Sequence, residues 1–229
     1  MSLRGDYITA IGHLVGGELP LGEAEKIFAI SKAVKAYSAT RPRAVSEDED
    51  GNGGFDYAIT LLAEWAEGFS VIKSVEYPVD DTEQAAALLQ DDAWQIYSKP
   101  AGKYLRLLRD TPEATEDLRI TYTALHLCTD TECTIPASDE EAVQMLAAAE
   151  FCDMLATYYA QTQDSTIQAD SVDHKSKAGE YAARARTYRK AYTDHMGTAN
   201  GPAAASVTRD QDTAGSWGAD KMTHPRRYR

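Results

Sequence analysis

The sequence has few cysteines and no long apolar run. Its three cysteines, Cys128, Cys133 and Cys152, are an odd number without a CxxC pair, which is typical of neither a disulfide framework nor a zinc knuckle. We expect them to be reduced and mostly buried. The longest apolar stretches, such as residues 145–149, are far shorter than the roughly 20 residues of a membrane span. Because the N-terminus also lacks a signal-peptide pattern, we expect a soluble protein made in the cytoplasm.

The sequence also lacks the motifs of common catalytic sites. No serine lies in a GxSxG elbow, the histidines are scattered, and there is neither a phosphate-binding loop nor a dinucleotide fingerprint. Residues 48–53 begin like a calcium loop, but the twelfth position is Ile59 instead of Glu, which favours a solvated acidic loop. His126, Cys128 and Cys133 do not have zinc-site spacing and are interpreted as core residues. We therefore expect no catalytic residue, no cofactor and no metal, and we predict that the chain is not an enzyme.

Positive charge is scarce, and it is unevenly placed. The formal net charge is −13, which argues against general nucleic-acid binding, because phosphate contacts need clustered Lys and Arg. Residues 171–229 hold eleven Lys/Arg against six Asp/Glu, a net charge of +5, and residues 1–170 hold twelve against thirty, a net charge of −18. An acidic body with a basic end can contact two different surfaces, or neighbouring copies of itself.

What is present is a strong helical pattern. Apolar residues recur at about 3.6-residue spacing in three long segments, and the second of these starts at a Ser138 to Glu141 capping box. We predict a mainly α fold, a bundle of three long helices with a small antiparallel β-rich insertion and an extended C-terminal arm. The predicted helices span about residues 22–39, 139–161 and 172–195, after a shorter amphipathic segment at 7–15.

The insertion between the first two long helices has the composition of β-strands. In residues 118–126, Leu118, Ile120 and Tyr122 share one face at period 2. Shorter strand-like runs predict the rest of one small sheet, and their aromatic content leads us to expect a contact with a partner or the next copy. The predicted organisation is N-terminal helices and an acidic loop (1–54), the β-rich insertion (55–136), the long helices completing the body (137–197) and the C-terminal arm (198–229).

The predicted arm, residues 198–229, is rich in Ala, Gly and Thr and cannot fold alone. Although this composition also fits a floppy end, the arm contains large apolar side chains and arginines, the residue types that carry binding energy at interfaces. We predict that it docks on a partner. The candidate docking residues are Trp217, Met222, Arg226, Arg227, Tyr228 and Arg229.

Several stretches, taken together and in order, carry a family resemblance. They are residues 33–43 (AVKAYSATRPR), 69–78 (FSVIKSVEYP), 134–136 (TIP), 147–152 (AAAEFC) with Leu155 and residues 159–160, and 167–173 (IQADSVD) with 183–186 (ARAR) and Tyr192. Together they span roughly residues 23–195. In content and order they resemble the head-to-tail connector (adaptor) proteins of long-tailed bacteriophages. The β-rich stretch at 55–133 does not align with the minimal helical members of that family, which leaves its role open.

The resemblance implies a structural virion protein located in the neck, at the head–tail interface. Such adaptors form a ring of twelve copies below the portal protein, extend the DNA channel, and present a surface to the next neck or tail protein. Their C-terminal segments dock on the portal, and DNA passes through without specific binding. Two alternatives remain: another neck part, such as a stopper or tail-completion protein, or an enzyme or metal-binding protein whose site is assembled from distant residues.

Overall fold

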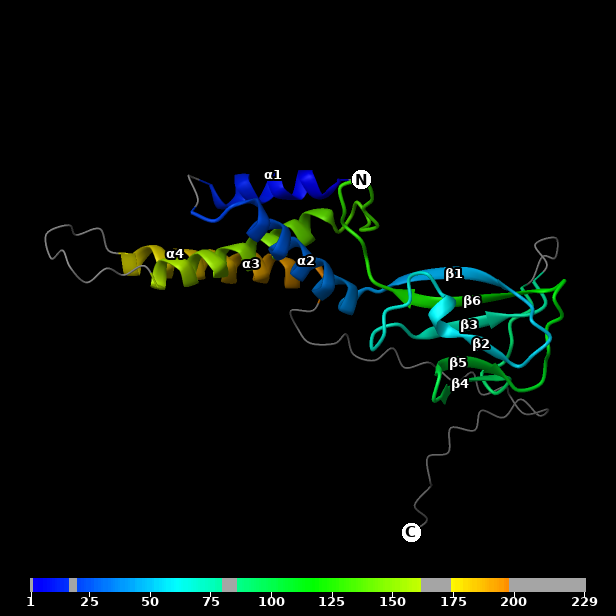
Figure 1. Cartoon of the computed structure of the whole chain (residues 1–229). Helices are drawn as coiled ribbons and strands as arrows, with labels where there is room; N and C mark the ends of the chain where they lie inside the picture. Colours follow the sequence, from blue (N-terminus) through cyan, green and yellow to red (C-terminus); the bar gives the residue numbers. More distant parts are fainter. Residues whose placement is uncertain (1, 17–19, 80–85, 162–173, 198–229) are drawn as a thin grey trace, which may run out of the picture.

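The computed structural model describes residues 2–16, 20–79, 86–161 and 174–197. In this part of the chain, helices gather at one end of an elongated molecule and strands at the other (Figure 1). We call these regions the helical part (α1, α2, α3 and α4) and the β part (residues 43–124). The elements are α1 (Arg4–Val15), α2 (Glu23–Thr40), β1 (Arg43–Asp50), β2 (Asp56–Ala58), the 3₁₀-helix η1 (Ile59–Leu61), β3 (Ile72–Glu76), β4 (Trp94–Lys99), β5 (Gly102–Leu107), β6 (Asp117–Ala124), α3 (Glu140–Gln161) and α4 (His174–His195).

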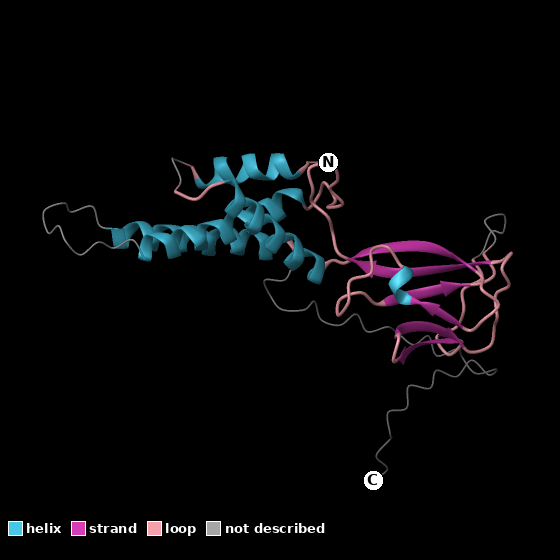
Figure 2. Ribbon diagram, viewed as in Figure 1, coloured by secondary structure: helices cyan, strands magenta, loops and turns pink. Residues whose placement is uncertain are grey.

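The helical part is built around one apolar core. Helices α3 and α4 lie side by side in opposite directions, and α1 and α2 pack on α3 (Figures 1 and 2). Helix α2 contributes buried residues at helical spacing, among them Ile30, Val34 and Tyr37. Helix α4 contributes Ala185 and Tyr192 to the same core. Because four helices share this core, none of them needs to be stable alone.

The three long predicted helices are confirmed to within a residue or two of their ends. The predicted apolar stripe of α3 is partly buried at Met154, 38% exposed at Tyr158 and buried at its other positions, Val143, Leu146, Ala147, Phe151 and Leu155. The helix begins at Glu140, and the Ser138 hydroxyl lies 3.3 Å from Asp139 Oδ1, to which it donates. Asp139, interpreted from the sequence as part of the helix start, has a larger role that is described below.

The β part consists of two three-stranded antiparallel sheets, with strand orders β1-β6-β3 and β2-β5-β4. They share one core, in which Leu105 and Leu107 of β5 meet Leu118, Ile120 and Tyr122 of β6. The predicted inward face of β6 is therefore confirmed. Two sheets packed through alternate side chains can fill a core that a single small sheet would leave exposed.

Two predictions for this region are wrong. The fold is mixed α and β instead of mainly α, with two sheets in place of the single one expected. Residues 46–50, predicted as an acidic loop, belong to strand β1. Ser46 bonds Thr121 at 2.8 Å and Asp48 pairs with Arg119 at 2.6 Å, both across to β6. These long-range partners outweigh the low strand propensity of acidic residues.

The β part is an insertion between α2 and α3. The chain enters it through Arg41 and Pro42 and leaves it through residues 125–139. This placement agrees with the predicted order of the pieces, although strand structure starts at Arg43. The division of the whole chain at residues 54, 136 and 197 stays a prediction.

Candidate interaction site

The candidate docking residues of the arm lie outside the described residues. This applies to Trp217, Met222, Arg226, Arg227, Tyr228 and Arg229, all within 198–229. What the structure describes is the body that would carry such an arm, together with the surfaces that this body exposes.

A buried carboxylate lies where the helical part meets the connection to the β part. Asp139 is only 2% exposed. It accepts hydrogen bonds from the Tyr37 hydroxyl and Arg41 Nη1, each at 2.7 Å, and from His195 Nε2 at 3.1 Å. Its partners thus come from α2, from the connection to the β part and from the end of α4. One side chain ties together three segments that are far apart in the sequence.

The partners of Asp139 keep it ionised. Burial alone would raise its pKa, but the hydrogen bonds from Tyr37, His195 and Arg41 outweigh burial and lower the pKa to about 2. Burial and the bond to Asp139 in turn raise the pKa of Tyr37 well above its usual range. The junction therefore holds a carboxylate with satisfied partners, as expected of a structural hub.

His126 forms the other half of the junction. Its ring lies 4.9 Å from the ring of Tyr37, Nε2 lies 3.0 Å from the Arg41 carbonyl, and Nδ1 lies 3.2 Å from Thr134 Oγ1. Nδ1 also lies 3.0 Å from the Thr134 carbonyl, so each ring nitrogen faces a carbonyl, and a neutral imidazole donates to only one of the two. Burial lowers the pKa of His126, in agreement with the neutral form.

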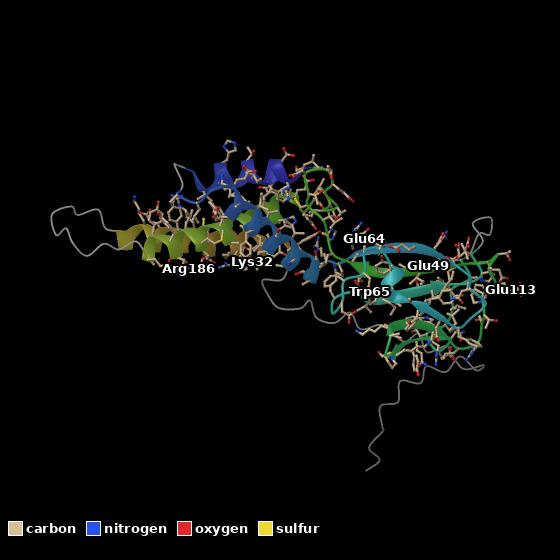
Figure 3. The ribbon with its side chains drawn as sticks, viewed as in Figure 1. Lys32, Glu49, Glu64, Trp65, Glu113 and Arg186 are labelled. Carbon is tan, nitrogen blue, oxygen red and sulfur yellow. The ribbon has the colours of Figure 1, made fainter. Side chains whose placement is uncertain are left out.

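The exposed face of α4 is basic. The helix carries six Lys/Arg against two Asp/Glu. Some of these cations stabilise the packing of α4 on its neighbours. Arg189 lies 2.9 Å from Glu150 and also pairs with Asp153. Arg184 Nη1 donates to the Val15 carbonyl at 2.9 Å. Others, such as Lys177 and Arg186, are exposed on the surface. Figure 3 shows Arg186 and Lys32 on the helical part.

The β part has the opposite charge. Within its described residues, 43–79 and 86–124, seven Lys/Arg face fourteen Asp/Glu, a net charge of −7. Figure 3 shows Glu49, Glu64 and Glu113 spread over this part, away from Arg186. Like charges even face each other at one end, where Asp50 is paired with Asp117 in the register of β1 and β6. The acidic β part and the basic helix α4 thus carry charge of opposite sign.

The β part also exposes apolar side chains along an edge strand. Strand β4 pairs with β5 and lies at the edge of its sheet. Ile96 is 45% exposed and Tyr97 is 39% exposed, with the Arg106 guanidinium 3.8 Å from the centre of the Tyr97 ring. Large apolar groups on a sheet edge are typical of contact surfaces. The expectation that the insertion makes a contact stays a prediction.

A shallow pocket of about 220 Å³ lies between α2 and α3 in the helical part. At its rim, Phe28 is 63% exposed and Lys32 pairs with Glu150. The pocket is lined by Phe28, Ala29, Lys32, Glu150, Asp153, Met154 and Thr157. Its charged groups already pair with one another, and it holds no nucleophile beside a base.

The metal sites considered from the sequence are not assembled in the described residues. Asp48 is held by Arg119, and both ring nitrogens of His126 have partners in the chain. Among the residues that the structure places, no group of three or more His, Cys, Asp or Glu is arranged to hold a metal ion. Within the same residues, no helix is both long and apolar enough to cross a membrane.

Sequence reasoning did not identify Asp139, His126 and Arg41 as a cluster. Asp139 follows a serine at a helix start, where an acidic residue is ordinary. The only available signal was that the resembling stretch 33–43 contains both Tyr37 and Arg41, four residues apart and thus on one helical face.

Comparisons with known proteins give limited matches. No protein-family model matches the chain, and no curated protein matches it. Among solved structures, it is similar to a chain of the "Neck of empty GTA particle computed with C6 symmetry", with 15% identity, 79% of this chain and 92% of that chain covered, and a TM-score of 0.29. It is also similar to a chain of the "Neck of native GTA particle computed with C12 symmetry", with 13% identity, 79% and 91% coverage, and a TM-score of 0.29. Both the identities and the TM-scores of these matches are low.

Proposed function

We propose that the chain is a head-to-tail connector (adaptor), a virion structural protein without catalytic activity. In this role it forms a ring of about twelve copies under the portal protein and extends the DNA channel. Its other face is the attachment surface for the next neck or tail protein. The resemblance of the sequence to adaptors is the origin of the proposal, and three features of the molecule support it.

The observation that carries the proposal is the place of the resembling stretches in the fold. Residues 33–40 lie on α2, residues 147–152 on α3 and residues 183–186 on α4. Buried side chains from all three, such as Val34, Phe151 and Ala185, meet in one core. Three of the segments that resemble adaptors therefore pack together, whereas another, residues 69–78, lies in the β part and contains β3.

The second supporting feature is the separation of charge. A closed ring uses a heterologous interface, in which one surface of a copy contacts a different surface of the next copy. The basic face of α4 and the acidic β part are two such surfaces, of opposite sign and at different ends of the molecule. Opposite potentials guide neighbouring copies into register and accelerate their association. An acidic surface facing the channel also repels phosphates, so that DNA passes without specific binding.

The third supporting feature is the arm. In the sequence, residues 198–229 come two residues after the end of α4, so each copy in a ring would contribute one arm. Many weak attachments of this kind add through effective concentration. The arm offers two kinds of side chain. Apolar pockets on the portal protein would take Trp217, Met222 and Tyr228. Carboxylates there would pair with Arg226, Arg227 and Arg229.

The proposal is tested by co-sedimentation with portal rings of the same particle. We expect the full chain to sediment with the rings, and a chain without residues 198–229 to remain in the supernatant while circular dichroism shows it folded. Trp217→Ala should weaken attachment, because truncation at a hot spot costs about 2 kcal/mol or more per copy. Gln211→Ala, in the same arm, is the matched control and should bind normally. Full binding by the truncated chain would mean that the arm is not the attachment.

A further inference from the structure

Cys128 and Cys133 face each other across a small hairpin formed by residues 127–134. They are paired in an antiparallel bridge. The Thr134 amide donates to the Leu127 carbonyl at 3.0 Å, and the Thr129 amide donates to the Glu132 carbonyl at 2.7 Å. These bonds flank the cysteine pair on both sides, so the pair occupies a non-hydrogen-bonded position of the ladder.

This position has the geometry of a disulfide. Directly opposed residues at non-hydrogen-bonded positions have their Cα atoms about 4.5 Å apart, closer than at hydrogen-bonded positions. A disulfide joins residues whose Cα atoms are about 4.4–6.8 Å apart. The separation typical of such a position thus lies at the lower end of the range for disulfides.

The two thiols differ in access. Cys133 is 5% exposed and belongs to the helical core, whereas Cys128 is half-buried at its edge. The third cysteine, Cys152, is fully buried on α3. A small reagent can therefore reach Cys128 first, with Cys133 directly behind it. Because Cys152 is fully buried, it is an internal control for a thiol that the reagent does not reach.

The hairpin holds the start of α1. The Arg4 amide donates to the Thr129 carbonyl at 3.1 Å, and Arg4 Nε donates to Asp130 Oδ1 at 2.8 Å. Since α1 packs on α3 through Tyr7 and Ile11, the hairpin fixes one end of the helical part. A covalent link across the hairpin would strengthen this attachment.

We propose that Cys128 and Cys133 are a redox-dependent modification site, at which a small-molecule disulfide converts the thiol pair to an intramolecular disulfide. The Cys128 thiolate attacks one sulfur of the reagent and expels the other as a thiolate. The Cys133 thiolate then attacks Cys128 Sγ and expels the second reagent sulfur. One reagent disulfide is reduced to two thiols, which take up the two cysteine protons, and one protein disulfide is formed. The inference does not depend on the proposed function.

The surroundings make the exchange slow at neutral pH. Burial, followed by the neighbouring Cys133, raises the pKa of Cys128 to about 12, while Arg4 acts in the opposite direction and Glu140 adds to the rise. Asp130 and Glu132 are the other charged groups of the hairpin. Because the thiolate is the attacking species, the rate of exchange should rise with pH.

The test uses the full chain in native buffer at about pH 8.5, incubated with oxidised glutathione, alkylated and analysed by peptide mass spectrometry. We expect the number of free thiols to fall from three to one, with a cross-linked peptide pair that has lost two hydrogens and joins Cys128 to Cys133. Cys152→Ser should form the same link. Cys133→Ser should stop at a glutathione adduct on Cys128.

Three results would overturn the proposal: three thiols that persist, glutathione on Cys128 of the native sequence beside a free Cys133, or a disulfide between two chains. A second measurement distinguishes disulfide formation in the folded protein from reaction of unfolded protein. Oxidation should raise the thermal midpoint of the native sequence and leave that of the Cys128→Ser/Cys133→Ser double variant unchanged. An equal shift in both proteins would also contradict the proposal.

Discussion

His195 Nε2, in the last residue of α4, lies 3.1 Å from Oδ1 of Asp139, the residue that directly precedes α3. This contact brings the C-terminal end of one long helix to the N-terminal end of the other. Because the other oxygen of Asp139 accepts from Tyr37 and Arg41, the same carboxylate also reaches the entrance of the β part. Asp139 thus shares with His126 the contacts that hold the connection to the β part against the helices.

Asp139→Asn tests this hub. The amide keeps the shape but removes the charge and one acceptor, so we expect the free energy of unfolding to fall by about 2 kcal/mol, the scale of a buried hydrogen bond to a charged group. Urea denaturation at neutral pH measures it. Asp194→Asn removes a carboxylate from the exposed pair with Lys190 and should change stability by less than about 0.5 kcal/mol. Equal effects of the two substitutions would contradict the central role of Asp139.

The same hub predicts loss of stability in acid. The pKa of Asp139 is about 2 in the folded protein, below its ordinary 3.8, so the unfolded chain binds the proton more readily. The contribution of Asp139 is complete above about pH 4 and is lost as the pH falls towards 2. The difference in unfolding free energy between the native sequence and Asp139→Asn should therefore shrink across this window. If the difference in unfolding free energy stays constant instead, titration of Asp139 is not a cause of the loss of stability in acid.

His126 predicts a separate pH effect. Its pKa lies below the ordinary 6.5 because the ring is buried, so the folded protein favours the neutral form. Stability from this group is complete above about pH 6.5 and declines as the pH falls below it. In His126→Gln this part of the pH dependence should disappear, as measured by thermal unfolding between about pH 7.5 and 5. His13→Gln, on the half-exposed surface of α1, should retain it.

The packing of α4 on α3 can be tested at one small residue. Ala185 is fully buried and belongs to the helical core, whereas Ala183 is exposed on the same helix. Ala185→Leu should destabilise the protein by about 1–3 kcal/mol through overpacking. Ala183→Leu has the same effect on helix propensity and should stay within about 0.5 kcal/mol. Similar losses from both would indicate that α4 does not pack as described.

Charge reversal on the basic face tests the contact between copies. Lys177→Glu combined with Arg186→Glu should weaken ring assembly and reduce its dependence on salt, because the acidic β part of the next copy would then be repelled. Lys35→Glu reverses an exposed charge on α2 and is the control. Analytical ultracentrifugation with portal rings measures the assembly. If the control weakens assembly as strongly, the basic face is not the specific contact.

An element could be predicted from the sequence when local periodicity defines it, and could not when contacts between residues far apart in the sequence stabilise it. Helix α2 and the inward face of β6 follow from local periodicity, since Val34 and Tyr37, or Leu118 and Ile120, lie on one face whatever they contact. Strand β1 could not be predicted, because Ser46 and Asp48 are held by Thr121 and Arg119, which lie more than 70 residues away. The hub at Asp139 could not be predicted for the same reason. Its partners Tyr37 and His195 are far from it in the sequence and carry no local signal.

The central claim, that this chain is a ring-forming connector under the portal, is tested most directly by electron microscopy of the intact neck. The account predicts a cyclic ring of this chain, about twelvefold, directly below the portal, with density for residues 198–229 reaching up to the portal protein. A particle neck in which this chain is absent, or forms any arrangement other than a closed ring against the portal, would contradict it.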